Sequence, residues 1–310
     1  MIKNPYLKGK KAISRLGFGA WPLGNTAHGQ TMSETEGISL VRAAYDAGVT
    51  FYDTAPNYAN GRSETILGHA LKGIRDHVVI NTKFGHHSDG SIDFNETRLR
   101  ASVEGSLTRL QTSYMDSVIL HNPDQAILEG KTGHFDELAR LKTAGRILGY
   151  GVSIDSPAEL KLALRRDDIE VIELLFNVFS QAPRTMFEEV KKRNISLIIK
   201  VPLDSGWLTG KYHKDMTFTD IRSRWTQHDK CRRHNLVEKM KTLTQDDALV
   251  KYALGFIWSY DAITTVIPGI RTSHQLKEHL HAEAFPFPCE LKQALETFYE
   301  TDIKPAPLPW

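Results

Sequence analysis

Short apolar segments alternate with segments of helical periodicity along this chain, and this alternation restricts its possible folds more than any other feature. The apolar segments are rich in β-branched and aromatic residues, which favours strands that are buried on both faces. Eight of them are present, and they end near Ala20, Asp53, Lys83, His121, Ser153, Asn177, Lys200 and Pro268. Because a helical segment follows each one, the sequence predicts a parallel sheet, and eight such units match a closed (β/α)8 TIM barrel.

Three further segments are expected outside the eight repeats. Tyr6–Ser14 contains Gly9-Lys10 between two short runs, which predicts an N-terminal β-hairpin. A long loop over Leu203–Thr244 should follow strand seven, and long loops often cover binding sites. Cys289–Thr297 predicts a C-terminal helix. Since one α/β barrel can account for all 310 residues, we expect residues 1–310 to form a single barrel domain.

A glycine cluster at Gly17-Phe18-Gly19 raises the alternative of an open, doubly wound sheet that binds a dinucleotide. That motif requires a third glycine at the start of a helix that follows directly. Here Trp21-Pro22 follows instead, and the next helix starts only after Ser33, which forms a capping-box pattern with Glu36. The sequence therefore favours the barrel.

Charge and cysteine content exclude several classes of function. The chain has 39 Lys and Arg against 37 Asp and Glu, a formal charge of +2, and no basic stripe indicates nucleic-acid binding. Cys231 and Cys289 are far apart, and the adjacent His86 and His87 would point apart on a strand, so neither a disulfide framework nor a metal site is predicted. No apolar run of about 18 residues predicts a membrane span, and the charged N-terminus does not resemble a signal peptide. We expect a cytoplasmic protein, either a monomer or a small homo-oligomer.

Ionisable side chains end three neighbouring strands of the expected barrel, namely Asp53, Lys83 and His121. A single polar residue at a strand end is most often structural, and Asp53 alone could simply cap a turn. Three consecutive strands that end in this way, however, bring their side chains to the carboxyl rim, where (β/α)8 barrels have their active sites. Neighbouring strands lie about 5 Å apart, so the three side chains can converge.

Tyr58 adds a fourth polar group just beyond Asp53. The phenol of tyrosine is a weak acid with an unperturbed pKa of about 10. A nearby ammonium lowers that pKa, and a carboxylate holds the ammonium in place, so Asp53, Lys83 and Tyr58 predict a proton donor with a lowered pKa. His121 is expected to hydrogen-bond a substrate oxygen and to orient it.

Several stretches of the sequence resemble motifs of the aldo-keto reductase superfamily, and together they span most of the chain. They are DTAPNY at Asp53–Tyr58, NTK ending at Lys83, ILHNP around His121, GVS at Gly151–Ser153, FN at Phe176-Asn177, PLDSGWLTGKY at Pro202–Tyr212 and IPGIRTSHQLKEHL at Ile267–Leu280. The resemblance implies a (β/α)8 barrel enzyme, an NADP(H)- or NAD(H)-dependent oxidoreductase that interconverts a carbonyl (aldehyde, ketone or sugar) and an alcohol by hydride transfer. It also implies a catalytic tetrad of Asp53, Tyr58, Lys83 and His121, with Tyr58 as general acid in reduction and general base in oxidation.

The same resemblance implies a cofactor site that departs in part from the family pattern. Ser153 matches the serine at the nicotinamide carboxamide. Glu173 stands in place of the usual glutamine and could still accept from the amide nitrogen, while Lys200 stands where many members have an aromatic ring. The other implied cofactor residues of this rim are Pro202, Leu203, Ser205, Gly206 and Leu208.

The adenosine end of the implied cofactor site is near the C-terminus. Gly269 and Gln275 stand where well-known members have Lys and Arg for the 2′-phosphate. Arg271 and the helix start at residues 272–273 could bind a phosphate instead, since helix N-termini favour anions. Glu278 matches the acid that faces the adenine, and His279 follows it in place of an asparagine. NADP(H) is the expected cofactor, with NAD(H) as the alternative.

Substrate identity is much less constrained. Trp21, Phe84, Trp207 and Trp225 are candidate walls of a substrate pocket, although a single aromatic residue is more often there for packing. We expect a small-molecule aldehyde, ketone or sugar as the partner. The alternative function is a nucleotide-binding regulatory subunit of the same fold with little turnover, because some relatives bind nucleotide mainly to control a partner such as a potassium channel.

Overall fold

A computed structural model describes residues 1–27 and 30–309 of the chain. Its central sheet has eight strands in the order β12-β11-β10-β9-β8-β7-β6-β3, and neighbouring strands are parallel. In chain order these are β3 (Phe18–Gly19), β6 (Phe51–Asp53), β7 (Val79–Phe84), β8 (Met115–His121), β9 (Ile147–Ile154), β10 (Val171–Leu175), β11 (Ser196–Lys200) and β12 (Ile263–Val266). Parallel bridges from Leu16 to Val266 and from Gly19 to Gly269 join the two edges of the sheet. The expected (β/α)8 barrel is confirmed.

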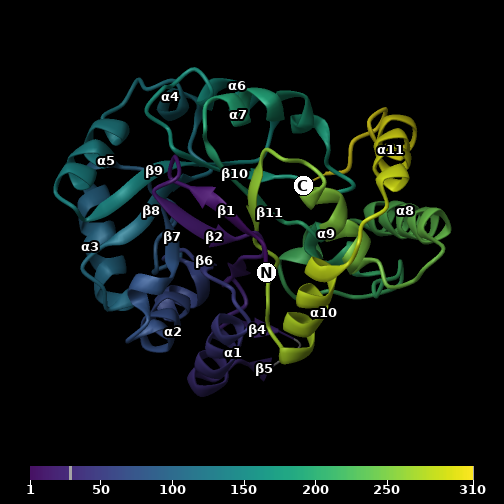
Figure 1. Ribbon diagram of the computed structural model, residues 1–310, viewed down its shortest axis with the longest axis horizontal. Helices are drawn as coiled ribbons and strands as arrows, with labels where there is room; N and C mark the ends of the chain where they lie inside the picture. The colour runs from purple at the N-terminus through teal and green to yellow at the C-terminus, as the bar shows by residue number, and fades with distance from the viewer. Residues whose placement is uncertain (28–29, 310) are drawn as a thin grey trace.

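Helices surround this barrel (Figure 1). The longer ones are α1 (Glu34–Asp46), α2 (Arg62–Leu71), α3 (Leu99–Leu110), α5 (His134–Thr143), α6 (Pro157–Ala163), α7 (Phe187–Lys192), α8 (Gln227–Thr244), α9 (Val250–Trp258), α10 (Ser273–Ala284) and α11 (Cys289–Phe298). Shorter turns are α4 (Gln125–Leu128), the 3₁₀ helices Tyr58–Gly61, Arg75–His77, Glu96–Arg98, Ala182–Met186, Asp204–Thr209 and Ile221–Arg224, and the π-helical Tyr299–Ile303. Two small antiparallel pairs lie outside the barrel: β1 (Lys3–Tyr6) with β2 (Lys11–Ser14), and β4 (Thr26–Ala27) with β5 (Gln30–Thr31). Among the described residues, none of the helices has the length and apolar character needed to cross a bilayer.

Helix α1 shows why the chain folds locally as expected. Ser33 Oγ accepts a hydrogen bond from the Glu36 backbone N–H at 3.2 Å, and the Glu36 carboxylate accepts one from the Ser33 N–H at 2.8 Å. This reciprocal capping box satisfies backbone donors that a helix start otherwise leaves unpaired. Leu40, Val41 and Ala44 lie on the buried side of the helix, and the burial of this apolar stripe stabilises it more than helix propensity does.

The N-terminal hairpin lies across one end of the barrel (Figure 1). The hydroxyl of Tyr6 lies 2.6 Å from Ser117 Oγ on β8, and both residues are fully buried. The backbone N–H of Leu7 donates to Ser196 Oγ, at the first residue of β11, at 2.9 Å. Since these contacts are made near the strand starts, the hairpin closes the amino end of the barrel, and a site can form at the carboxyl end.

The connection between β11 and β12 differs from the expected long loop, because α8 fills residues 227–244. The apolar stripe of α8 consists only of Leu236, Val237 and Met240, with Arg233 buried beside them. Most of its other residues are polar or charged, so the apolar periodicity that would reveal a helix in the sequence is weak. The expectation of a loop over Leu203–Thr244 is therefore wrong for its second half.

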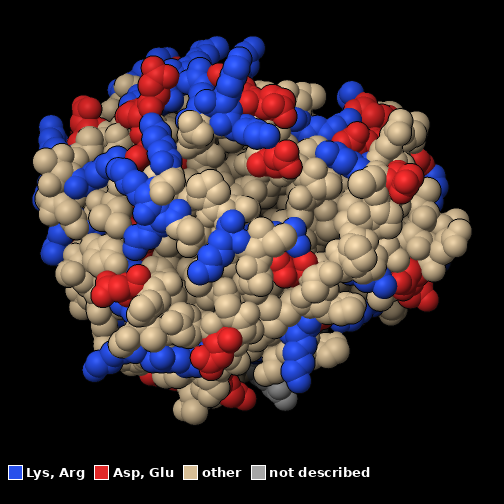
Figure 2. Space-filling model, in the orientation of Figure 1, with Lys and Arg blue, Asp and Glu red and all other residues tan. Residues whose placement is uncertain are grey.

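Charged side chains of both signs are interspersed around the face shown in Figure 2. Many of the surface charges form ion pairs between neighbouring elements, such as Arg146 with Glu104 and Arg184 with Glu300. Exposed pairs of this kind contribute only about 0–1 kcal/mol each. The stability of the fold rests instead on the apolar residues that are buried between the strands and the helices.

Candidate active site

The Asp53 carboxylate and the Lys83 ammonium form a buried ion pair at the carboxyl ends of β6 and β7. Lys83 Nζ lies 2.6 Å from each carboxylate oxygen of Asp53 and 3.1 Å from the Thr54 carbonyl oxygen. Asn81 Nδ2 donates a further hydrogen bond to Asp53 at 2.7 Å. Asp53 pairs with Asn81 in the strand register, and Lys83 follows two residues later on the same face, so both side chains of β7 reach Asp53.

A tight turn after β6 carries Tyr58 back toward Lys83. The Tyr58 N–H donates to the Ala55 carbonyl oxygen at 3.1 Å, and the two residues after Tyr58 are left-handed, with φ of 49° and 55°. Lys83 Nζ lies 5.4 Å from the centroid of the Tyr58 ring. His121, the last residue of β8, meets the same ring edge to face, with 6.3 Å between the ring centroids. The structure thus brings Tyr58 and the three strand-end residues together.

The pKa of Tyr58 is raised above the ordinary value for tyrosine, so the expectation of a lowered pKa is wrong. Burial is the largest cause, because a phenolate loses its hydration in a buried site. Lys83 acts in the expected direction and lowers the pKa, but the carboxylates of Asp53 and Glu173 raise it. At neutral pH, Tyr58 is therefore a phenol that holds its proton.

Glu173, in the middle of β10, is a second carboxylate partner of Lys83. Glu173 Oε2 lies 3.1 Å from Lys83 Nζ, and Glu173 Oε1 accepts a hydrogen bond from Ser153 Oγ at 3.2 Å. Burial and the Glu173 carboxylate raise the pKa of Asp53 to about 8, against the lowering effect of Lys83. Burial alone would also raise the pKa of Glu173, but Lys83 and Lys200 bring that pKa below its usual value. Two acidic side chains thus share one ammonium, and at neutral pH Glu173 is ionised while Asp53 is largely protonated.

A cluster of polar groups surrounds Ser153 at the carboxyl ends of β8, β9 and β11. Lys200 Nζ donates to Ser153 Oγ and to Asn122 Oδ1 at 2.8 Å each, and it lies 2.8 Å from Asp155 Oδ1. Ser153 and Lys200 are expected cofactor residues, whereas Asn122 and Asp155 were not predicted from the sequence to belong to this cluster. Asn122 directly follows His121 and has a left-handed φ of 54°. Asparagine tolerates the left-handed conformation better than most residues, so an asparagine directly after a strand is the sequence signal that could have identified Asn122.

His86 lies against the tetrad, although no sequence motif marks it. Its ring stacks on the ring of His121 with 4.2 Å between the centroids and 23° between the planes. Burial lowers the pKa of both imidazoles, so both are neutral at pH 7. The neighbouring His87 instead places its Nε2 2.8 Å from the Asp93 carbonyl oxygen. The two adjacent histidines do point apart, and one of them contacts a tetrad residue.

A left-handed turn follows β11. Asp204, Ser205 and Gly206 have φ of 45°, 52° and 106°. A Cβ on Gly206 would lie 2.6 Å from the Tyr212 ring, so the turn is built for glycine at this position. Turns of this kind gather backbone N–H groups on one side and suit anions such as phosphate. The expected cofactor residues Pro202, Leu203, Ser205, Gly206 and Leu208 all belong to this segment.

The amino end of α10, where a phosphate was expected, is capped by its own side chains. Gln275 Oε1 accepts hydrogen bonds from the backbone N–H groups of Arg271 and Thr272 at 2.8 and 3.3 Å. Thr272 Oγ1 in turn accepts from the Gln275 N–H at 3.2 Å. The Arg271 guanidinium donates to the Asn25 carbonyl oxygen at 2.7 Å. Several donors at this helix start therefore already have protein partners.

Glu278 and His279 lie further along α10 in different environments. Lys211 Nζ lies 3.4 Å from the Glu278 carboxylate, and this pair is partly exposed. His279 is only 2% exposed. Burial, with a smaller contribution from Lys211, lowers the pKa of His279 to about 4. His279 is thus a neutral packing residue beneath the neighbouring acid.

The four aromatic residues expected to line a pocket lie in different environments. Trp207 is fully buried and Trp225 is 6% exposed, and 6.1 Å separate their ring centroids. Both rings also contact Phe218, so they form an aromatic cluster within the connection from β11 to α8. Phe84 is fully buried as well, and only Trp21 is half-exposed. Packing accounts for three of the four rings.

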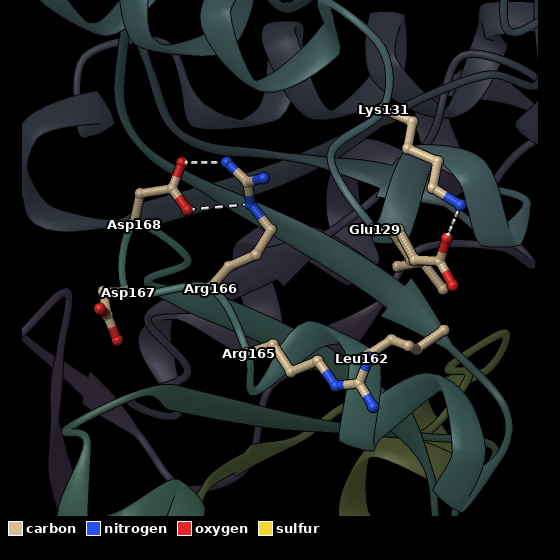
Figure 3. Close-up of a pocket in the computed structure, with 8 residues that line it drawn as sticks. Glu129, Lys131, Leu162, Arg165, Arg166, Asp167 and Asp168 are labelled. Atoms are coloured by element: carbon tan, nitrogen blue, oxygen red, sulfur yellow. Dashed lines mark hydrogen bonds and ion pairs between the residues drawn. The ribbon is translucent and has the colours of Figure 1, made fainter.

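A surface cavity of about 630 Å³ lies between α4 and α6 and shares no residue with the tetrad (Figure 3). It is lined by Leu128, Glu129, Lys131, Leu162, Arg165, Arg166, Asp167 and Asp168. Arg166 donates to both carboxylate oxygens of Asp168 at 3.0 and 2.7 Å, and Lys131 pairs with Glu129. The acidic and basic side chains balance, so no excess of one charge indicates an ionic ligand here.

Known proteins with similar sequences and structures identify the family. A model of the Aldo/keto reductase family matches residues 15–300. The chain is 34% identical over 251 residues to the aldo-keto reductase YhdN of Bacillus subtilis (strain 168), which covers 78% of this chain and 74% of that protein. It is 28% identical over 296 residues to a probable voltage-gated potassium channel subunit beta of Oryza sativa subsp. japonica, which covers 87% of each. The solved holo form of an aldo-keto reductase from Bacillus halodurans has a TM-score of 0.81 and 26% identity, covering 96% of both chains.

The barrel, the polar site at its carboxyl rim and these similarities define the class of the protein as an oxidoreductase built on a (β/α)8 barrel. Nearly the whole barrel falls within the matched residues 15–300. The chain belongs to the aldo/keto reductase family.

Proposed function

We propose that this protein interconverts a small carbonyl compound (aldehyde, ketone or sugar) and an alcohol by hydride transfer, with Tyr58 as general acid and base. The observation that carries the proposal is the cluster of Asp53, Lys83, Tyr58 and His121, in which Lys83 Nζ lies 2.6 Å from Asp53 and 5.4 Å from the Tyr58 ring. A bound nicotinamide dinucleotide would supply or accept the hydride.

The four side chains divide the proton chemistry among them. In reduction, the carbonyl oxygen gains negative charge as a hydride reaches its carbon, and Tyr58 gives that oxygen its phenolic proton. Lys83 stabilises the phenolate that remains, and Asp53 keeps the ammonium in place. His121 is neutral, because burial keeps its pKa well below the usual value. A ring N–H of His121 can therefore donate a hydrogen bond to the same oxygen. In oxidation, the Tyr58 phenolate accepts the proton of the alcohol.

The residues beside the tetrad fit a dinucleotide cofactor. The hydroxyl of Ser153, the amide of Asn122 and the ammonium of Lys200 converge within hydrogen-bond distance and suit a carboxamide. The left-handed turn at residues 204–206 suits a pyrophosphate. We propose NADP(H) as the cofactor. The family resemblance implies that the adenosine part of the cofactor binds near α10, and Arg271 and Lys211 add positive charge there. NAD(H) is the alternative.

The test is the oxidation of NADPH and of NADH with a panel of small aldehydes, ketones and aldoses. Tyr58→Phe keeps the ring but removes the proton, so a loss of about 10²–10⁴-fold in kcat is expected with little change in cofactor affinity. Equal rates for the two proteins would remove Tyr58 from its proposed role. Fluorescence titrations with NADPH and NADH, run side by side, decide between the two cofactors.

A regulatory subunit is the second candidate, favoured by the 28% identity to a probable potassium channel subunit beta. It predicts tight cofactor binding but no turnover of any substrate in the panel. The presence of all four tetrad side chains supports the enzyme over the regulator, since nucleotide binding alone requires no proton donor.

A further inference from the structure

Glu173 lies beside the tetrad but takes no part in the proton transfer proposed for Tyr58. The family resemblance implies a neutral glutamine there, whereas this chain places a carboxylate 3.1 Å from Lys83 Nζ. Lys83 Nζ also lies 2.6 Å from Asp53. None of the three side chains is more than 3% exposed. Water therefore screens their charges little, and each charge strongly affects the ionisation of its neighbours.

We propose that Glu173 is a positioning residue for the proton donor: as a second counter-ion of Lys83, it keeps the proton on Tyr58 as the pH rises and so extends carbonyl reduction to more alkaline pH. This inference rests on the proposed function, because it takes Tyr58 to be the group that exchanges the proton.

The balance of charge around Lys83 gives the physical reason. With Asp53 as its only partner, Lys83 would form a neutral pair, and the ammonium would be free to stabilise a phenolate on Tyr58. Glu173 adds a second negative charge, so above about pH 8, where Asp53 is ionised too, the cluster is already negative before Tyr58 ionises. A like charge nearby disfavours the ionised form of an acid. The phenolate of Tyr58, needed for oxidation, therefore forms less readily than the phenol needed for reduction.

The neighbouring groups do not cancel this effect. The titratable groups around the cluster are Asp53, Tyr58, Lys83, Lys200, His121, the neutral His86 stacked on it and, from the hairpin side, Tyr6. Lys200 holds Glu173 in its ionised form, but its own ammonium is paired with Asp155 at 2.8 Å. Because the pKa of Asp53 is about 8, both carboxylates are ionised at the alkaline pH where Tyr58 would lose its proton.

Glu173→Gln tests the proposal, because glutamine keeps the shape and an acceptor for Ser153 but removes the charge. The first measurement is the pH dependence of alcohol oxidation and carbonyl reduction. The rise of oxidation with pH should move to lower pH by about one unit, and the ratio of oxidation to reduction at a fixed pH above about 8, where both carboxylates of the wild type are ionised, should increase by up to about tenfold.

The second measurement needs neither cofactor nor turnover. Infrared spectra of the wild-type protein should show a protonated carboxyl band that disappears as the pH rises through about 8, from Asp53. In Glu173→Gln the repulsion is removed, so the pKa of Asp53 falls and this band should already be absent at neutral pH. A purely structural role of Glu173 would not move either titration.

Two variants serve as controls. Glu173→Asp keeps the charge and should return both titrations toward those of the wild type. Glu170→Gln removes another buried carboxylate, which lies just before β10 and pairs with Lys142, so both titrations should stay unchanged.

Identical pH profiles for wild type and Glu173→Gln would overturn the proposal, as would an equal loss of both reactions without a shift in pH. A wild-type protein that turns over no substrate would contradict the proposed function instead, and the infrared titration would still decide the charge balance.

Discussion

Lys83 and Asp53 lie 30 residues apart in the sequence, and Lys83 Nζ lies 2.6 Å from both carboxylate oxygens of Asp53. Adjacent parallel strands hold the two side chains at this distance, with Asp53 at the last residue of β6 and Lys83 at the second-last residue of β7. Ions at this depth are tolerated only when each has its partner. The stability of the barrel rim and the proton chemistry proposed for it therefore depend on the same charges.

The first prediction concerns Lys83→Met, which removes the ammonium from between Asp53 and Glu173. Asp53 loses its counter-ion and Glu173 keeps only the charge of Lys200, so the free energy of unfolding should fall by about 3–5 kcal/mol. Both carboxylates then gain protons more readily in the folded than in the unfolded state, so the loss should be smaller at about pH 5 than at about pH 8. Urea denaturation of both proteins at the two pH values measures this. A loss that is independent of pH would contradict the electrostatic explanation.

The second prediction concerns His86, whose ring stacks on His121 at 4.2 Å. His86→Ala removes the stack and lets the His121 ring turn, so kcat should fall by about tenfold through poorer orientation. His86→Phe keeps a flat ring at the same place and should retain most of the activity. Steady-state kinetics with one good substrate compares the two. An equal loss in both variants would mean that a nitrogen of His86 matters rather than its ring.

The third prediction concerns the left-handed turn after β11. In Gly206→Ala, φ of 106° is strained and the new Cβ would lie 2.6 Å from the Tyr212 ring, so the ring or the turn must move. A loss of about 1–3 kcal/mol in stability is expected, together with weaker cofactor binding in a fluorescence titration. Gly9→Ala is a matched control, because Gly9 has φ of 85° but no atom within 4 Å of the added Cβ. Gly9→Ala should be destabilising but should leave cofactor affinity unchanged.

The positions of strands and of the tetrad could be inferred from the sequence because they depend on local patterns. Apolar runs that end in Asp53, Lys83 and His121 predict the strands of the barrel. They also predict that these three side chains meet at its carboxyl rim, since side chains at the ends of parallel strands share one edge. Helix α8 could not be inferred, because its apolar stripe is too short to give a clear period.

The electrostatics of the site depend on three-dimensional placement and were harder to infer. The direction of the Tyr58 pKa is set by the depth of the phenol and by Glu173, which lies on a strand more than one hundred residues away in sequence. A sequence motif identifies the ammonium next to the tyrosine but not the number of carboxylates that share it. His86 was missed for the same reason, since only the turn after β7 places it on His121.

The last prediction concerns the pH dependence of stability through His279. Burial lowers the pKa of His279 to about 4 in the folded protein, whereas an unfolded chain has a histidine pKa of about 6.5. Between these values the unfolded state binds more protons than the folded state, so the free energy of unfolding should decrease as the pH falls through this window, by about 3 kcal/mol in all.

His279→Leu should remove this contribution at little cost, because the buried Nδ1 of His279 has no hydrogen-bond partner among the described residues. The difference in unfolding free energy between wild type and variant, measured by urea denaturation from about pH 7 to about pH 4, cancels the carboxylates that titrate in both. The variant should become the more stable protein toward the acid end.

His281 lies on the exposed side of the same helix. His281→Leu makes the same substitution at an exposed position and therefore serves as the control for the substitution itself. If the unfolding free energies of wild type and His279→Leu fall in parallel with pH, His279 does not contribute to the pH dependence. The buried ring of His279 would then accept a proton without opening α10.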